Sequence, residues 1–303
     1  MGRALITAIV VLFASSAAAQ SEIPIDTGLA VHLPADTVTD AELARALSRV
    51  SGEHRRFHLT GDRMPRIKVG TLKHSGRDLS PRDTATLLTP KAVLGVIVGG
   101  TVNDAGRLNR RLEQAMYDLA KAHGGAIEDI RTREYFSVQG FATRRLNAWQ
   151  GDVADAEAAT TIHLYADKGH HRAVTLGMER FGLPNVVVEG IPATLGAPVG
   201  RLMVLVCQTL VEGGIPTQRG FAVDIRKLKH RAAAKRITEA LEAGATQTGQ
   251  LAWVFGTPEK GDTPPLIQLT FSNQPGQSLQ QRMAAQLKQT LGHTGRISLV
   301  PNE

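Results

Sequence analysis

The chain has 303 residues, of which 42% are hydrophobic and 21% charged, and it carries a net charge of +7 and one cysteine. These values are typical of a globular protein and exclude intrinsic disorder, a collagen-like repeat and a scaffold held together by disulfides. The length suffices for two domains of roughly 100–200 residues each.

The first nineteen residues have the pattern of a secretory signal peptide. Met1–Arg3 is positively charged, Ala4–Ala14 is apolar or small apart from one threonine, and small residues lead to Ala19. The apolar run is shorter than the roughly 20 residues that a membrane-spanning helix needs. We therefore predict cleavage after Ala19, a periplasmic or secreted location, and no transmembrane segment in the processed chain.

Strands and helices alternate between residues 20 and 155. Thr39 and Glu42 have the spacing of a capping box, and Asp104 precedes an apolar stripe that ends at Gly124–Gly125. The predicted strands are 29–33, 66–72, 92–98 and 126–130, and the predicted helices follow Thr39 and Asp104 and cover 140–149.

The same alternation continues from residue 156 to residue 303. A Gly169 turn separates two β-rich runs, and two more apolar runs resemble a second hairpin. The predicted strands are 161–165, 172–175, 185–189, 251–255, 266–271 and 296–300, and the predicted helices are 198–211, 224–243 and 278–291.

The pattern predicts an α+β fold with mixed or antiparallel sheets covered by helices. The small, acidic stretch 151–159 has no apolar stripe and marks the expected boundary between two subdomains of similar size, 20–155 and 156–303.

A cationic segment lies within the helix predicted for 224–243. Six permanent cations fall within eleven residues. The functional interpretation of such a local field is docking to an acidic protein, an anionic membrane surface or a polyanion, and a solvated outer face is the default interpretation. The predicted partner-binding residues are Arg226, Lys227, Lys229, Arg231, Lys235 and Arg236.

Histidines gather around the Gly169 turn. A hairpin there is expected to bring His163 near His171, with His170 and Asp167 adjoining. Imidazole and carboxylate groups are zinc ligands, although no strict metal-binding spacing such as H-E-x-x-H is present. These four residues define the alternative metal site, and a solvated turn is the default interpretation.

Two further residue types have a structural interpretation. Cys207 lies in an apolar run with no adjoining charge, so we expect a buried, unreactive thiol. Glu128 and Asp129 are followed by Arg131 and Arg133, which predicts surface ion pairs in place of acid–base chemistry.

Two segments resemble bacterial domains of unknown function. In Ala120–Asp129 a helix ends in Gly-Gly before a strand and an aspartate, and Thr175–Pro184 has the pattern T-x-G-x-x-x-F-G-x-P before another strand. The resemblance implies no particular activity, so it assigns no catalytic residue.

These patterns together predict an exported binding or accessory protein of the cell envelope, without a cofactor, that engages an acidic envelope protein or an anionic polymer. Sparse aromatic residues and the expected export weigh against nucleic acid as the partner. The alternatives are a metal-dependent hydrolase that uses zinc at the histidine-rich turn, and a structural pair of subdomains that acts only with another chain.

Overall fold

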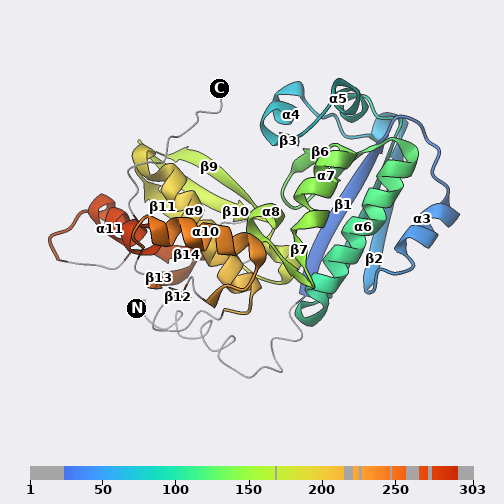
Figure 1. Cartoon of the computed structure of the whole chain (residues 1–303). Helices are drawn as coiled ribbons and strands as arrows, with labels where there is room; N and C mark the ends of the chain where they lie inside the picture. The colour runs from blue at the N-terminus through green and yellow to red at the C-terminus, as the bar shows by residue number, and fades with distance from the viewer. Residues whose placement is uncertain are drawn as a thin grey trace, which may run out of the picture. The chain divides into compact units, whose positions relative to one another are not determined.

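The computed structural model describes residues 24–167, 169–214, 221–224, 227–245, 248–256, 266–271 and 275–292. The predicted signal peptide and the strand predicted for 296–300 lie outside these residues. The chain divides into two units, which we call unit 1 (Met1–Leu146 with Arg180–Gly182) and unit 2 (Asn147–Glu179 with Leu183–Glu303). Each unit contains a six-stranded sheet and helices, so the predicted α+β class is confirmed (Figure 1).

Unit 1 is built on a sheet with the strand order β2-β4-β1-β5-β6-β3. All neighbouring strands are antiparallel except β3 and β6, which are parallel. The strands are β1 (Pro24–Leu33), β2 (Glu53–Thr60), β3 (Gly76–Arg77), β4 (Ala92–Thr101), β5 (Ala126–Asp129) and β6 (Glu134–Phe136).

Helices cover both faces of this sheet. The larger core lies on the face covered by α3, α6 and α7, and a smaller core including Leu72, Leu87 and Tyr135 lies on the face covered by α4 and α5. The helices are α3 (Asp40–Leu47), α4 (Val69–Ser75), α5 (Pro81–Leu88), α6 (Ala105–His123) and α7 (Val138–Arg144).

The ends of two helices follow from local sequence. The capping box predicted at Thr39 is present, because the Thr39 side chain accepts from the Glu42 amide and the Glu42 carboxylate accepts from the Thr39 amide. Helix α6 ends at Gly124, whose left-handed conformation (φ 64°) glycine adopts without steric cost.

Unit 2 is built on a sheet with the strand order β12-β13-β14-β11-β10-β9. The two predicted hairpins pair as antiparallel strands, β9 with β10 and β13 with β14, while β11 and β14 are parallel. The strands are β9 (Thr161–Asp167), β10 (His170–Leu176), β11 (Asn185–Ile191), β12 (Phe221–Asp224), β13 (Thr248–Gly256) and β14 (Leu266–Thr270), and a separate hairpin is formed by β7 (Trp149–Gln150) and β8 (Val153–Ala154).

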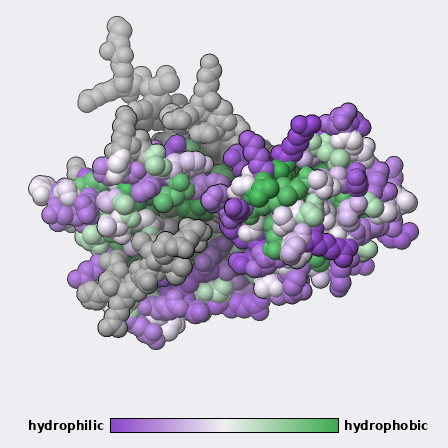
Figure 2. All heavy atoms as spheres, turned by 90° about the horizontal axis from the view of Figure 1, so that it is seen from above, coloured by the Kyte–Doolittle hydropathy of each residue, from purple (hydrophilic) through white to green (hydrophobic). Residues whose placement is uncertain are grey.

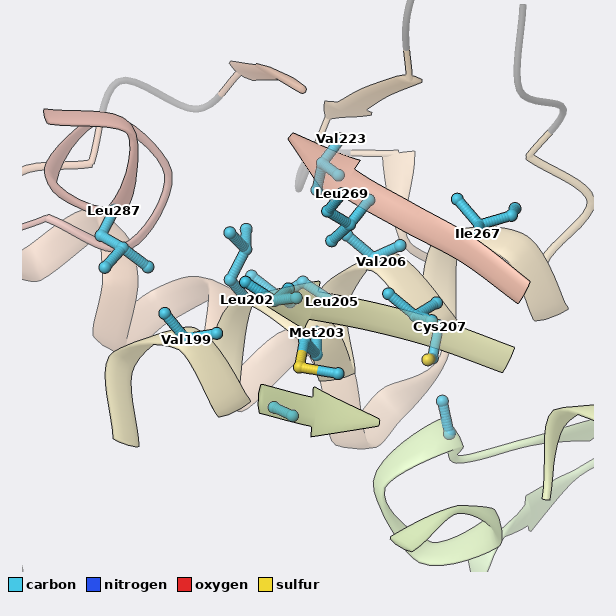
Figure 3. Close-up of a cluster of buried hydrophobic side chains, with 14 of the residues drawn as sticks. Val199, Leu202, Met203, Leu205, Val206, Cys207, Val223, Ile267, Leu269 and Leu287 are labelled. Atoms are coloured by element: carbon cyan, nitrogen blue, oxygen red, sulfur yellow. The ribbon is translucent and has the colours of Figure 1, made fainter. Parts of the chain in front are cut away.

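The core of unit 2 lies between this sheet and its helices. Figure 3 shows side chains of α9 beside Val223, Ile267 and Leu269 of the sheet and Leu287 of α11. The helices are α8 (Ala156–Ala159), α9 (Gly196–Val211), α10 (Arg231–Glu242) and α11 (Leu279–Leu291), and short 3-10 turns occur at Gly61–Arg63, Val102–Asp104, Leu146–Ala148, Met178–Phe181 and Ala193–Leu195.

Segment Ala193–Val211, which ends in α9, is long and apolar enough to cross a membrane by length and composition, and it is the one such helix in the described part of the chain. It is mostly buried inside the structure, as the core helix of a globular unit is. In the view of Figure 2 most of the described surface is hydrophilic.

Several elements differ from the sequence-based prediction. The helix predicted for 140–149 is divided: α7 ends at Arg144, a 3-10 turn follows, and Trp149 belongs to strand β7. Residues 66–72 do not form a strand: α4 begins at Val69, and Val69 is 54% exposed whereas Leu72 is buried, so the apparent alternation does not define a buried face. Strand β2 was not predicted, because none of its residues is buried. The helix predicted from Asp224 begins only at Arg231, after the strand β12.

Candidate functional site

The predicted cationic segment is divided between a loop and a helix. Lys227 and Lys229 precede α10, while Arg231, Lys235 and Arg236 belong to it, and Arg226 lies outside the described residues. The prediction of one continuous cationic helix is therefore wrong. The physical reason is that residues 221–224 pair with β13 as a strand, and His230 then starts the helix by accepting a hydrogen bond from the Ala232 amide.

Several of these cations already have partners within unit 2. Arg236 Nη2 lies 2.6 Å from Asp155 Oδ1 and 2.7 Å from Glu157 Oε2, and Arg231 Nη2 donates to the Asn147 carbonyl at 2.8 Å. Arg236 therefore connects α10 to α8. Because its side chain is only 20% exposed, Arg236 is poorly placed to meet a partner.

The remaining cations of the segment are exposed but lie close to carboxylates. Lys227 Nζ is 4.0 Å from Asp224 Oδ2, and Lys235 Nζ is 3.8 Å from Glu239 Oε1. Lys229 is exposed, and its backbone amide donates to Glu212. The field expected from six cations is thus reduced by neighbouring acids.

The predicted histidine cluster does not assemble as expected. The register places His163 opposite Val174 and His171 opposite Ala166, so these two imidazoles lie on opposite faces of the hairpin. His170 shares the face of His163 but lies four residues further along the register, about 13 Å away at the usual strand rise. The expectation that the hairpin brings His163 near His171 is wrong.

The described residues at this turn do not form a set of zinc ligands. His170 lies opposite Asp167, whose side chain is outside the description, and no group of three His, Cys, Asp or Glu side chains in the described ranges is placed to hold a metal. The zinc-dependent hydrolase remains a prediction without a described coordination sphere.

A basic surface that was not assigned to partner binding lies in unit 1. Residues 45–73 contain eight Lys or Arg residues and two acidic residues, a net charge of +6. All eight cations are exposed, and none has a carboxylate within ion-pair distance in the part of the chain that the structure describes.

Some of these cations gather on one side of the unit 1 sheet. The register places His54 opposite Val98 and Arg56 opposite Val96, and both valines belong to the core beneath α3 and α6. Directly opposite residues of an antiparallel pair point to the same side, so His54 and Arg56 lie on the side of the sheet that α3, α6 and α7 cover.

Helices α3 and α6 contribute the remaining cations on this side of the sheet. Arg45 and Arg49 lie on α3 and just beyond it, and Arg111 Nη1 of α6 donates to the Arg49 carbonyl at 3.2 Å. We call the set Arg45, Arg49, His54, Arg56 and Arg111 the basic face.

A charge network is buried in unit 1 next to the larger core. Arg180 Nη2 lies 2.5 Å from Asp129 Oδ2, and Arg145 Nη2 lies 3.0 Å from the same oxygen. Arg180 Nη1 also lies 3.3 Å from Glu113, and Arg145 Nη2 lies 2.7 Å from Glu134. All five side chains are at most 10% exposed. The surface ion pairs predicted for Asp129 are therefore wrong: this carboxylate is buried, and its partners come from distant parts of the chain.

The electrostatics of Asp129 follow from this burial. Burial by itself raises the pKa of a carboxyl group, but the guanidinium groups of Arg180 and Arg145 outweigh that effect and hold the pKa of Asp129 below its ordinary value. The amides of Arg131 and Thr132 donate to Asp129 Oδ1 as well. Arg77 Nε lies 2.8 Å from Glu134 Oε1, so a third guanidinium balances the three carboxylates. Such a network, with its charges compensated and its carboxylates buried, is suited to holding the fold and not to binding a ligand.

A second polar group lies on the other face of the unit 1 sheet. His32 Nε2 is 2.8 Å from Glu128 Oε2, and Tyr135 is also hydrogen-bonded to Glu128. Burial, together with the Glu128 carboxylate, raises the pKa of Tyr135 to about 12. The Nδ1 atom of His32 is buried and has no hydrogen-bond partner among the described residues. Because that atom has no access to solvent, the imidazole is not placed to act as a base toward a ligand in this conformation.

The structure confirms the prediction for the cysteine. Cys207 is fully buried in the core of unit 2, and burial raises the pKa of its thiol to about 12 (Figure 3). A thiol with this pKa is almost entirely protonated near neutral pH and is a poor nucleophile.

Comparisons of the chain with protein-family models, with curated proteins and with solved structures find no match. A functional conclusion therefore depends on the geometry described above.

Proposed function

We propose that the chain is a binding protein that engages an acidic partner through the basic face of unit 1. The observation that carries this proposal is the contrast between the cations of unit 1 and those of α10. Arg49 and Arg56 are exposed without a carboxylate partner among the described residues, whereas Arg236 is held by two carboxylates. Cations without internal partners contribute most to the field that a ligand meets.

The chemistry of the basic face favours an acidic protein segment. Phe57 is the aromatic residue of β2, and it lies opposite Gly95, on the other side of the sheet from His54 and Arg56. A Cβ at Gly95 would overlap the Phe57 ring, so this ring packs against the sheet and does not offer a stacking surface. Without stacking residues, the basic face is better suited to carboxylates than to single-stranded nucleic acid.

The location belongs to the proposal as well. The signal peptide predicted for residues 1–19 would direct the chain to the periplasm or the exterior, where acidic envelope proteins are available partners. Attraction between exposed charges falls off over about 10 Å at 0.1 M salt, so binding through this face should weaken as the salt concentration rises.

The experiment measures the fluorescence anisotropy of a labelled twenty-residue polyglutamate peptide against the processed protein at low salt. The test variant carries Arg49→Glu, Arg56→Glu and Arg111→Glu. The control carries Lys229→Glu, Arg231→Glu and Lys235→Glu, which changes the net charge equally but in unit 2.

We expect the test variant to bind at least about tenfold more weakly and the control to remain within about twofold of the unmodified protein, since about 1.4 kcal/mol corresponds to tenfold. Equal losses in both variants would show that only net charge matters and would refute the assignment of the face. Loss in the control alone would return the partner site to the segment around α10.

A further inference from the structure

A row of polar and aromatic side chains crosses four neighbouring strands of the unit 2 sheet. Arg172 of β10 lies opposite Tyr165 of β9, and its Nε atom is 3.5 Å from Glu189 Oε1 of β11. Gln268 Nε2 of β14 donates to Glu189 Oε2 at 3.1 Å. The four strands are adjacent in the order β14-β11-β10-β9. We call Tyr165, Arg172, Glu189 and Gln268 the polar row.

The polar row lies on the face of the sheet opposite the core that α9 and α11 cover. Its strand neighbours Ala173, Val188, Ile267 and Leu269 are buried in the core beneath α9 and α11. Successive side chains of a strand point to opposite faces, so the row points away from those helices. Tyr165 is 48% exposed and the Glu189 side chain is 52% exposed, so a ligand can reach both side chains.

The edge strand adds a pair of stacked rings to this face. His163 and Tyr165 have ring centroids 6.2 Å apart and an interplanar angle of 27°. A tyrosine held by a neighbouring ring presents an apolar surface together with a hydroxyl group, at a small cost in side-chain entropy. This end of the row is therefore suited to stacking against the apolar side of a ligand ring.

The charge balance of the row restricts the chemistry of that ligand. Arg172 and Glu189 compensate each other, so the row attracts neither a polyanion nor a polycation, in contrast to the basic face of unit 1. The row nevertheless offers guanidinium and amide donors beside carboxylate and amide acceptors. A ring with an apolar side and hydroxyl groups that both donate and accept matches this combination, and sugar rings have these properties.

We infer that the polar row binds an uncharged glycan, with one sugar ring against Tyr165 and the hydroxyl groups of this and the adjoining sugars hydrogen-bonded to Arg172, Glu189 and Gln268. The row crosses three strand spacings of about 4.8 Å, so it accommodates more than one sugar. The contacts of Glu189 with Arg172 and Gln268 hold the polar groups in place before a ligand arrives, which lowers the entropic cost of binding. This inference involves residues of unit 2 alone and does not depend on the proposed role of the basic face.

The experiment uses saturation-transfer NMR and titration calorimetry on the processed protein with three uncharged probes: cellotetraose, chitotetraose and maltotetraose. Tyr165→Ala removes the stacking surface. Leu164→Ala is the matched control, because Leu164 is on the same strand, is 51% exposed and points to the opposite face. Glu189→Ala is a second test variant, at an exposed position where folding is not at risk.

We expect at least one probe to bind, Tyr165→Ala to weaken its binding about tenfold or more, Glu189→Ala to weaken it several-fold, and Leu164→Ala to leave it unchanged. The inference is overturned if none of the three probes binds, or if Leu164→Ala weakens binding as much as Tyr165→Ala. It is also overturned if the row binds oligothymidine or polyglutamate in a Tyr165-dependent manner and none of the glycans.

Discussion

The buried charge network of unit 1 predicts a large stability difference between two similar substitutions. Asp129→Asn keeps the shape of the side chain but removes the negative charge that faces Arg180 and Arg145. Removing one partner of a buried ion pair costs about 3–5 kcal/mol, because the opposite charge stays buried. Since Glu113 and Glu134 still contact the two guanidinium groups, we expect the lower end of that range, about 3 kcal/mol.

The matched control is Asp78→Asn in the same unit. Asp78 Oδ2 lies 2.7 Å from Arg144 Nε, but both side chains are about half exposed, and such pairs contribute less than about 1 kcal/mol. The backbone of Asp78 has a positive φ of 54°, which asparagine tolerates, so the control adds no backbone strain.

The assay follows unit 1 and unit 2 separately during unfolding in urea. Both tryptophans, Trp149 and Trp253, belong to unit 2, so their fluorescence reports on that unit, and hydrogen exchange at β1 and β4 reports on unit 1. We expect Asp129→Asn to lower the protection of β1 and β4 by about 3 kcal/mol. A loss no larger than that of Asp78→Asn would refute the assignment of a stabilising role to the network.

Three further predictions concern individual groups. Because the pKa of Asp129 is lowered in the fold, its ionised carboxylate stabilises unit 1 at pH values above the ordinary carboxyl pKa. This contribution is lost as the pH falls through the lowered pKa. The stability of the unmodified protein should therefore drop more steeply below about pH 4 than that of Asp129→Asn in acid unfolding curves. Cys207 should react with iodoacetamide only after unfolding, as mass spectrometry of alkylated samples would show, and rapid labelling of the native chain would contradict its burial. Arg236→Met should destabilise unit 2 by more than about 1 kcal/mol in urea unfolding, whereas Lys235→Met should change it by less than about 0.5 kcal/mol; equal effects would show that the contact with Asp155 contributes nothing.

The elements that could be predicted from sequence are those whose apolar periodicity matches their burial. Helix α6 has its buried side chains on one stripe, and β4 is an apolar run buried in the sheet, so both were predicted close to their observed bounds. Strand β2 was missed for the opposite reason: it is an edge strand with exposed residues on both faces, and its sequence carries no alternation.

The candidate sites were harder to predict, because they depend on which residues meet across the sheet. The spacing of His163 and His171 suggested proximity, but the register puts them on opposite faces. Arg145 and Arg180 are separated along the chain from Asp129, and nothing in their local sequence indicates that both reach it. The excess of cations between residues 45 and 73 was visible, but the segment 226–236 is more densely basic in sequence. The acids that compensate that segment include Asp155, Glu157 and Glu212, which are distant from it along the chain.

The arginines of this chain show why a count of charges does not identify a binding surface. Arg180 is buried against carboxylates, Arg236 ties two helices together, and Arg56 is exposed without a partner among the described residues. The first two contribute to stability, because their charges are satisfied within the fold and little of their field reaches solvent. Only the third kind offers attraction to another molecule, so a basic surface is assigned by the absence of compensating acids and not by the density of basic residues.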